Sequence, residues 1–452
     1  MKKILLFLSV ILLIAGCASK RYTKKAAKFE EAGLYEDAAA YYYEAVRKKD
    51  SNVDAKLGLR KTGQQTLDKK LSEFNIAYKQ ADYKKAVYNY IDAENYFNKI
   101  KAVNVELNFP EYYKEYYEES KNDYLNKKYT DGVDKLNRDD FAAALLVFEE
   151  IKKIDGNYKD VKDLYITAKY EPFYREANTN LDNGLYRKAY YTFDNILKGT
   201  GGYKQANTLK EEALQKGTIT ILVTDFQYSN TYTRNTSQAV TSKVRSQLST
   251  SENPFIKIID VSAINANIYQ DGRLNMQAAN LSGIKAILTG NVSRVVENTG
   301  KLNKTEKRGY IKEVRKVKND KGEDIDKVEY FKTTYYEYEA ENYASVELNF
   351  KLISTENNEI LVSDLVSLTN NDKMHYASFS GEKKTLVPGY WKYKDRKSPE
   401  DNVKDNQSDI NRLKNLLNAS KDIKSTTELL DEVIKQSVQR ISDKVNKYNP
   451  EK

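Results

Sequence analysis

The sequence predicts a protein of the α + α/β class, with an N-terminal α-solenoid of helix pairs followed by an α/β sheet domain. In residues 24–216, proline is nearly absent and apolar residues recur at spacings of three and four, which is the helical period. In residues 217–452, β-branched runs alternate with amphipathic stretches and charged insertions, as expected for a sheet covered by helices. The domain boundary is therefore expected at residue 217.

Residues 1–16 are expected to be an export signal. Lys2 and Lys3 form a basic start, residues 4–14 are almost wholly apolar, and small residues follow. This order is typical of a signal peptide, and the apolar run is shorter than the ~20 residues that a membrane-spanning helix needs. Residues 17–23 then form a short lipidated tether before the first repeat.

Cys17 follows this signal directly and is the only cysteine of the chain. The segment Ile14-Ala15-Gly16-Cys17 resembles the lipobox of bacterial lipoproteins, which implies that Cys17 is acylated, with palmitate among its lipids. The alternative is a plain signal peptide that ends beside a buried or incidental cysteine. Residues 18–21 lack the aspartate and the acidic cluster of inner-membrane and surface signals. The resemblance therefore implies anchoring in outer-membrane lipid, facing the periplasm.

A short motif recurs four times in the helical half: an aromatic residue, an alanine three positions later, and a second aromatic residue four positions after that. Residues three, four and seven apart share one helix face, so the alanine permits close approach of a neighbouring helix and the aromatic residues fill the groove around it. These repeat-packing residues are Tyr35, Ala38 and Tyr42; Tyr83, Ala86 and Tyr90; Phe141, Ala144 and Phe148; and Tyr186, Ala189 and Phe193.

Turn-like residues precede the four copies, namely Gly33, Asp82, Asp139 and Gly184. The pattern resembles tetratricopeptide-type helix-turn-helix repeats, although its copies start 45 to 58 residues apart, beyond the standard period of ~34 residues. The resemblance implies an α-solenoid whose extended surface holds another protein, while the motif residues themselves pack inside.

β-branched runs predict strands in the second half, and the segments between them predict helices. Residues 328–352 alternate apolar with charged side chains, which predicts a long strand with one solvated face. Glu337, Glu339 and Glu341 are expected on that exposed face, and residues 369–424 are expected to form a charged loop. Further strands are expected at residues 218–226, 255–261, 286–296 and 359–368, and helices at 237–248, 274–281 and 425–447.

Four segments of this half, ILVTDF, IKIIDVSAIN, GIKAILTGNVSRV and VELNFKLISTENNEILVSD, look like the CsgG-type lipoprotein domain. That family includes the curli-secretion channel and is similar in fold to lipoproteins that activate peptidoglycan synthases. The channel threads membrane hairpins from each subunit, and the candidate here is the hairpin of residues 309–341. Its first arm carries charges on both faces, whereas a membrane strand needs ~9–11 residues with a clean lipid face. A pore made by this protein alone is therefore not expected.

Catalytic constellations are scarce. His375 is the only histidine, so neither a His-based metal cluster nor a Ser-His-Asp triad can form within the chain, and no phosphate-loop motif occurs. His375 is expected on a loop, as a surface or packing residue. Trp391 is expected to pin a long loop, with a docking platform for sugar or protein as the alternative. Lys and Arg (74) are interspersed with Asp and Glu (65), which is typical of a solvated surface. No catalytic activity, cofactor, metal or nucleic-acid partner is predicted.

The sequence as a whole therefore favours a non-enzymatic outer-membrane lipoprotein scaffold that recruits unidentified envelope proteins in secretion or assembly. Its sheet domain is expected to dock to envelope machinery or to copies of itself, as a homo-oligomer. The alternative is a periplasmic regulator that binds and activates a peptidoglycan synthase. An oligomeric secretion pore is a less favoured third hypothesis. Resemblance of fold does not decide among them.

The lipobox resemblance gives the first testable prediction. Cys17→Ser removes the thiol that would carry the lipid, so the variant should accumulate as an unprocessed and unlipidated precursor. Labelling with a radioactive fatty acid and fractionation of membranes measure both properties. Mature Cys17→Ser protein that still fractionates with the outer membrane would contradict the assignment of Cys17 as the anchor.

Overall fold

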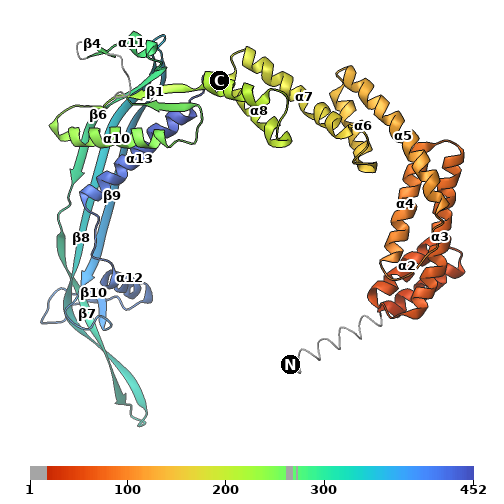
Figure 1. The fold of residues 1–452 in the computed structure, drawn as a ribbon. Helices are drawn as coiled ribbons and strands as arrows, with labels where there is room; N and C mark the ends of the chain where they lie inside the picture. Colours follow the sequence, from red (N-terminus) through yellow and green to blue (C-terminus); the bar gives the residue numbers. More distant parts are fainter. Residues whose placement is uncertain (1–17, 261–267, 271–272) are drawn as a thin grey trace. The chain divides into compact units, whose positions relative to one another are not determined.

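The computed structural model describes residues 18–260, 268–270 and 273–452 (Figure 1), so the expected signal peptide and Cys17 lie outside the described residues. The chain forms two compact units. One contains residues 18–178 and 195–206, and the other contains 179–194 and 207–452. The first is helical and the second holds a mixed sheet with helices, which confirms the α + α/β class. No described helix is both long and apolar enough to cross a membrane.

Helices follow one another from residue 18 to the start of the sheet. Residues 18–31 are helical. The later helices are α2 (Tyr35–Lys48), α3 (Val53–Lys79), α4 (Tyr83–Lys101), α5 (Tyr112–Asn137), α6 (Phe141–Ile154), α7 (Val161–Asp182), α8 (Tyr186–Thr200) and α9 (Ala206–Gly217). Each copy of the motif occupies the second helix of a helix pair, namely α2, α4, α6 or α8.

The first aromatic residue of each motif copy is the first residue of its helix. Two positions earlier, the backbone of each copy enters the left-handed region, with φ between 56° and 78°. In the first copy, the amide of Leu34 donates to the carbonyl of Phe29 at 2.9 Å, a hydrogen bond that closes the preceding helix. The residue with positive φ in the second copy is Ala81, not Asp82. Asp82 instead caps α4, because its side chain accepts from the amide of Lys85.

The alanine and the second aromatic residue of every motif copy are buried. A glycine on the facing helix makes room for the second aromatic residue in two pairs. A Cβ on Gly132 of α5 would lie 2.6 Å from the ring of Phe148, and one on Gly58 of α3 would lie 2.3 Å from the ring of Tyr42. The first aromatic residue is different, because Tyr35 is 38% exposed at the start of its helix. Tyr35 therefore does not fill the groove as expected, whereas Tyr83 is half-buried and packs against the neighbouring core.

Tyrosine–carboxylate contacts add polar links between the packed helices. Glu150 of α6 accepts hydrogen bonds from Tyr88 of α4, at 2.9 Å, and from Tyr124 of α5. Lys128 of α5 pairs with the same carboxylate at 2.7 Å. Burial opposes the charge on Glu150, but hydrogen bonds from the lysine and both tyrosines lower its pKa overall. One carboxylate thus joins three helices, a link that the helical period of the sequence does not reveal.

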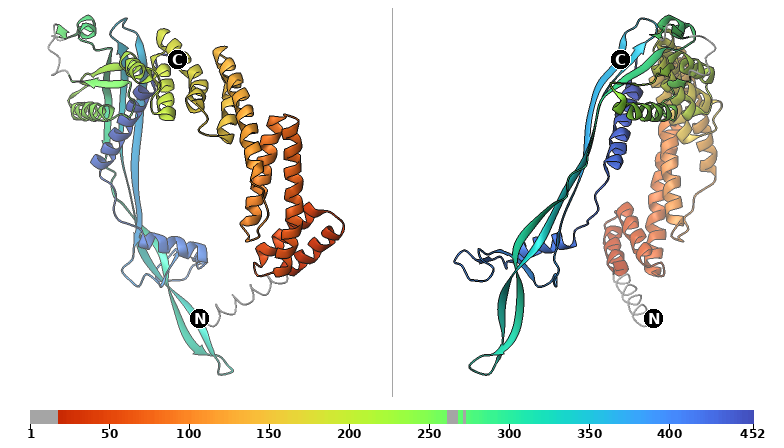
Figure 2. Two further views of the ribbon diagram at one scale, coloured as in Figure 1. Left: turned by 45° about the vertical axis from the view of Figure 1, so that its right-hand side comes forward. Right: turned by 90° about the vertical axis from the view of Figure 1, so that its left-hand side faces the viewer.

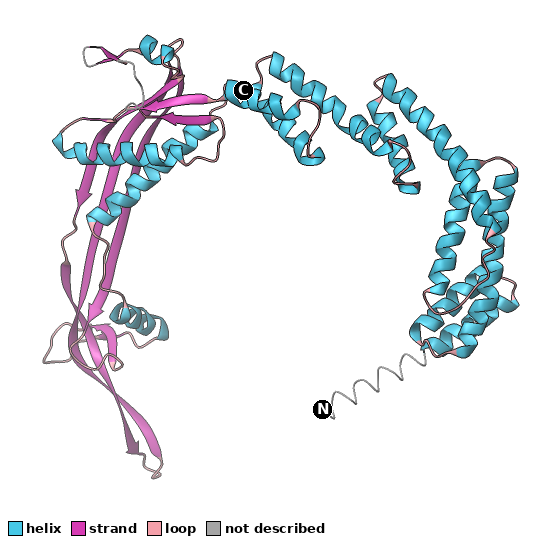
Figure 3. Ribbon diagram, viewed as in Figure 1, coloured by secondary structure: helices cyan, strands magenta, loops and turns pink. Residues whose placement is uncertain are grey.

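The second unit is built around a mixed sheet (Figure 3). Its strands run in the order β11-β10-β7-β8-β6-β1-β3. β1 is parallel to β3 and β6, and β9 pairs with β8 antiparallel. The strands are β1 (Ile219–Val223), β2 (Gln227–Tyr228), β3 (Ile256–Ile259), β6 (Ala286–Asn298), β7 (Asn303–Lys318), β8 (Asp324–Ser354), β9 (Ile360–Ser378), β10 (Leu386–Tyr390) and β11 (Asn402–Val403), with β4 (Tyr269–Gln270) and β5 (Arg273–Leu274) as a separate pair.

The helices of this unit pack on both faces of the sheet. α10 (Arg234–Ser249) and α13 (Thr426–Lys447) cover the face that carries Val346, Leu348, Phe350 and Leu352 of β8. α12 (Gln407–Asn418) packs against Tyr335 of β8 on the opposite face, since side chains alternate along a strand. α11 (Met276–Leu281) and the 3-10 turn η1 (Thr231–Thr233) also belong to this unit.

The prediction of one long loop over residues 369–424 is wrong. β9 continues to Ser378, and β10, β11 and α12 follow within that range. Asn370–Lys373 contains no apolar residue, but its backbone pairs with residues 341–344 of β8. Backbone pairing with β8 therefore makes this stretch a strand, although its side chains lack the apolar alternation by which a strand is recognised in a sequence.

The burial of the motif alanines gives a prediction about stability. Ala144→Glu places an unpaired charge between α5 and α6, where burial costs several kcal/mol. The variant should unfold at a clearly lower temperature than the parent protein, as followed by circular dichroism at 222 nm. Leu146→Glu is the matched control, because Leu146 lies on the same helix and is 68% exposed. Equal melting temperatures for the two variants would contradict the packing role of Ala144.

Candidate functional site

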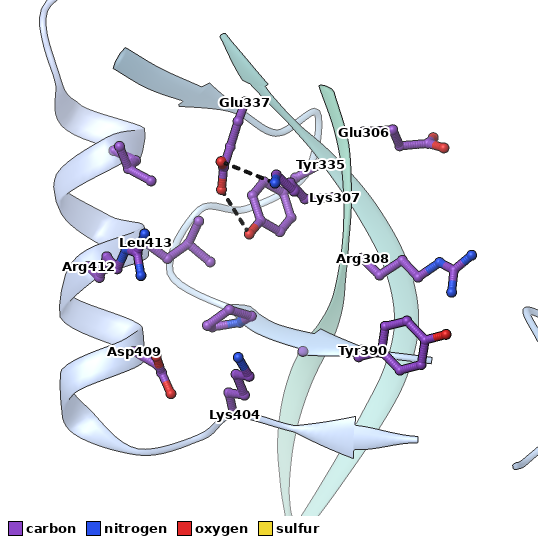
Figure 4. Close-up of a pocket in the computed structure, with 13 residues that line it drawn as sticks. Glu306, Lys307, Arg308, Tyr335, Glu337, Tyr390, Lys404, Asp409, Arg412 and Leu413 are labelled. Carbon is purple, nitrogen blue, oxygen red and sulfur yellow. Dashed lines mark hydrogen bonds and ion pairs between the residues drawn. The ribbon is translucent and has the colours of Figure 1, made fainter. Parts of the chain in front are cut away.

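A cavity of about 660 Å³ lies between α12 and the strands β7, β8 and β10 (Figure 4). Its volume is within the ~300–1,000 Å³ range of small-molecule sites. The lining combines charged, aromatic and aliphatic side chains. They are Glu306, Lys307, Arg308, Tyr335, Glu337, Pro388, Gly389, Tyr390, Lys404, Asp409, Arg412, Leu413 and Leu416.

Strand register places one wall of this cavity. Lys307 of β7 is directly opposite Tyr335 of β8, and Thr305 is opposite Glu337. The Tyr335 hydroxyl donates to Glu337 at 3.3 Å, and the Lys307 ammonium lies 3.8 Å from the same carboxylate. Burial and the neighbouring Glu337 raise the pKa of Tyr335 to about 12, so this hydroxyl stays protonated at neutral pH.

α12 forms the facing wall. The Asn406 side chain caps the helix by accepting from the amide of Asp409 at 3.0 Å. Asp409, Arg412, Leu413 and Leu416 then follow at helical spacing, so they share the face that lines the cavity. Neither Arg412 nor the Lys404 side chain makes an ion pair within the described part of the chain. Both charges are therefore available at the cavity.

His375 lies in strand β9 and not on a loop, as the sequence had suggested. It is directly opposite Glu339 of β8, and its Nε2 atom lies 3.2 Å from Glu339 and 3.5 Å from Glu337. Glu339 is largely exposed, as expected, and Glu341 is half-exposed, but the Glu337 side chain is mostly buried. Within the described residues, no group of three His, Cys, Asp or Glu side chains could hold a metal ion.

Trp391 pins the segment that follows β10 to the β7–β8 hairpin. Its buried indole donates to the carbonyl of Gly309 at 3.1 Å and to that of Thr333 at 3.2 Å. The guanidinium carbon of Arg308 lies 4.9 Å from the centroid of this ring, and the same guanidinium donates to the Trp391 carbonyl at 2.6 Å. A Cβ on Gly309 would approach the carbonyl of Val387 to 2.8 Å, so this close approach of strands requires glycine.

Two aspartates fasten the same segment to the hairpin. Asp405 pairs with Lys312 at 2.8 Å and accepts a hydrogen bond from Tyr330. Asp401 pairs with Lys332 at 2.7 Å. Hydrogen bonds from Lys312 and Tyr330 lower the pKa of Asp405. These contacts link residues 69 to 93 positions apart, and residue patterns in the sequence carry no signal for them.

Beyond these contacts the β7–β8 hairpin continues as a ribbon arm, residues 313–329 (Figure 2). Within the described residues, no third strand pairs with either edge of this arm. Val314 faces Val328 across the ribbon, and Val317 faces Ile325 on its other side. Val314 and Val328 are 54% and 42% exposed. The arm closes at residues 319–323, within the candidate hairpin of residues 309–341.

The predicted site residues occupy different environments. The alanines and second aromatic residues of the motif lie in the helical packing, and Cys17 lies outside the described residues. The cavity was missed, because α12 falls in the stretch interpreted as a loop. Its leucine spacing was the one available signal. No family model and no curated protein matches the chain.

The lowered pKa of Asp405 gives a prediction with a definite sign. A carboxyl group whose pKa is lower in the folded state stabilises the fold above its unfolded pKa of ~3.9, and the contribution is lost as the pH falls through the folded value. Asp405→Asn should therefore destabilise the protein at pH 7, by on the order of 1 kcal/mol or less, because the pair is partly exposed. The difference should shrink towards pH 3.

Trp391 is the only tryptophan, so its fluorescence during unfolding in urea reports on this segment. Asp395→Asn is the control, because it removes the same charge from the same segment without removing a described ion pair. A difference that stayed constant between pH 7 and pH 3, or an equal effect of Asp395→Asn, would exclude the proposed contribution of Asp405.

Proposed function

We propose that this protein is a lipid-anchored, non-enzymatic scaffold of the outer membrane that holds partner proteins in envelope secretion or assembly. The observation that carries the proposal is the ribbon arm, residues 313–329. It places two unpaired strand edges and the apolar pairs Val314–Val328 and Val317–Ile325 at the end of a hairpin that is fastened at its base.

The physical argument concerns what such an arm can do. A two-stranded ribbon is marginally stable alone, and its unpaired N–H and C=O groups can pair with another chain. Charges flank the apolar pairs on both sides, as Lys312, Lys316 and Asp326 do on the face of Val314. A protein partner with an apolar strip and polar edges fits this pattern, because it covers the valines and leaves the charges in water.

The helical unit supports the same proposal. The alanines and second aromatic residues of its motif are buried, while other aromatic residues remain exposed on the helices, including Tyr88, Tyr112 and Phe173. Tyrosine is well suited to a recognition surface, since it offers apolar area and a hydroxyl with little conformational freedom to lose. Repeat helices commonly present such surfaces to proteins.

The lipid anchor expected at Cys17 completes the proposal. Two or more acyl chains hold a protein stably at a membrane, whereas one chain gives only marginal binding. A tether of this kind would keep both units beside the membrane while leaving their surfaces accessible. The regulator hypothesis uses the same surfaces, with a peptidoglycan synthase as the partner.

The ribbon arm predicts a specific crosslink. A photoreactive amino acid at Val314 should give an adduct with a defined envelope protein in cells, and Val328→Glu should reduce that adduct at least tenfold without lowering the melting temperature. The control position is Leu281 of α11, which is 84% exposed and lies outside the arm. Mass spectrometry of the adduct separates a secretion apparatus from a peptidoglycan synthase.

Two outcomes would contradict the proposal that this protein is a scaffold. Adducts that form equally at Val314 and Leu281 would show that the arm has no specific partner. Adducts formed only with further copies of this chain, together with detergent-dependent rings and stable single-channel currents, would move the protein to the secretion-channel class.

A further inference from the structure

We infer that the cavity beneath α12 is a binding site for a small organic oxyanion, a carboxylate or phosphate joined to an aromatic or aliphatic group. This inference is independent of the scaffold function, because it concerns a small ligand and a different surface. It rests on the balance of charges in the cavity, on the placement of the free cations, and on the apolar floor between them.

The carboxylates of the cavity are already engaged. Glu337 is paired with Lys307 and accepts from Tyr335. Asp409 accepts from the side-chain amide of Asn406 at 2.7 Å. Figure 4 shows the third carboxylate, Glu306, directed away from α12. Glu337 is therefore neutralised and Glu306 faces outward, whereas Asp409 keeps its charge because its amide partner is neutral.

Only two of the four cations that line the cavity have partners within the described residues. Lys307 is held by Glu337, and Arg308 is held by the carbonyl and ring of Trp391. Arg412 and Lys404 remain without a carboxylate partner among the described residues. They come from α12 and the segment just before it, across the cavity from Tyr335 and Glu337 (Figure 4). These two cations outnumber Asp409, so the charge left over inside the cavity is positive.

This pair of cations suits an oxyanion. Arginine presents a planar fork of donors that matches the two oxygens of a carboxylate or phosphate, and lysine adds a mobile point charge. Hydrogen bonds between charged groups are about twice as strong as neutral ones. Because Arg412 is on a capped helix, its backbone position is fixed before a ligand arrives.

An apolar floor adjoins these cations. Leu413 is buried against Tyr335, and Leu416 and Pro388 line the same cavity. A bare inorganic ion would leave this surface in contact with water. A ligand with an aromatic or aliphatic group beside its oxyanion would cover it, at ~25 cal/mol for each Å² of apolar surface removed from water.

Isothermal titration calorimetry of the full-length protein in detergent tests the inference, with phenyl phosphate and benzoate as probes and inorganic phosphate as the comparison. At least one aromatic probe should bind, and more tightly than inorganic phosphate. The stronger probe identifies the oxyanion that the site prefers. Arg412→Gln and Lys404→Gln should each weaken that probe about tenfold, and binding should weaken further with added salt.

Lys414→Gln is the matched control, since Lys414 is an exposed residue of the same helix that does not line the cavity. It removes the same charge and should leave the affinity unchanged. Failure of both aromatic probes to bind would overturn the inference. So would unchanged affinity in both cavity variants, or a loss in Lys414→Gln equal to that in Arg412→Gln.

Discussion

The second unit depends on the backbone pairing of one strand, β8. Its 31 residues pair successively with β7, then with β9 and β6, and the strand thus connects the ribbon arm to the covered sheet. Side chains alternate along this strand. Val346, Leu348, Phe350 and Leu352 therefore meet α10 and α13 on one face, while Tyr335 and Glu337 point to the side of α12. A shift of one residue in this register would exchange the two faces and remove both the core and the cavity wall.

Parts of this architecture could be predicted because they depend on local periodicity. Ala144 and Phe148 are four residues apart on one helix, and their burial follows from the helical repeat alone. Ala344 to Leu352 alternate regularly, and this stretch is strand. The continuation of β9 through Asn370 and Lys373 could not be predicted, because its backbone partners are about thirty residues away and its side chains show no apolar pattern.

The cavity, too, could not be predicted from the sequence. The leucines of α12 recur at helical spacing, but Tyr335 and Lys307 meet them only through strand register and through the path of residues 391–405. Ion pairs such as Lys312–Asp405 hold that path in place, and a Lys or Asp in this chain has many candidate partners in sequence. Long-range polar contacts therefore determine the site, and composition alone cannot select them.

The arm and the cavity share one structural support. Asp405 holds the base of the arm through Lys312, and its neighbour Lys404 lines the cavity. Asp401 and Trp391 fix the rest of the segment to the hairpin on which the arm is built. An exposed two-stranded ribbon would otherwise be free to fray, because each of its strands pairs with only one neighbour. The loop that fastens the arm thus also positions Lys404 at the cavity, and the arm and the cavity owe their geometry to the same few contacts.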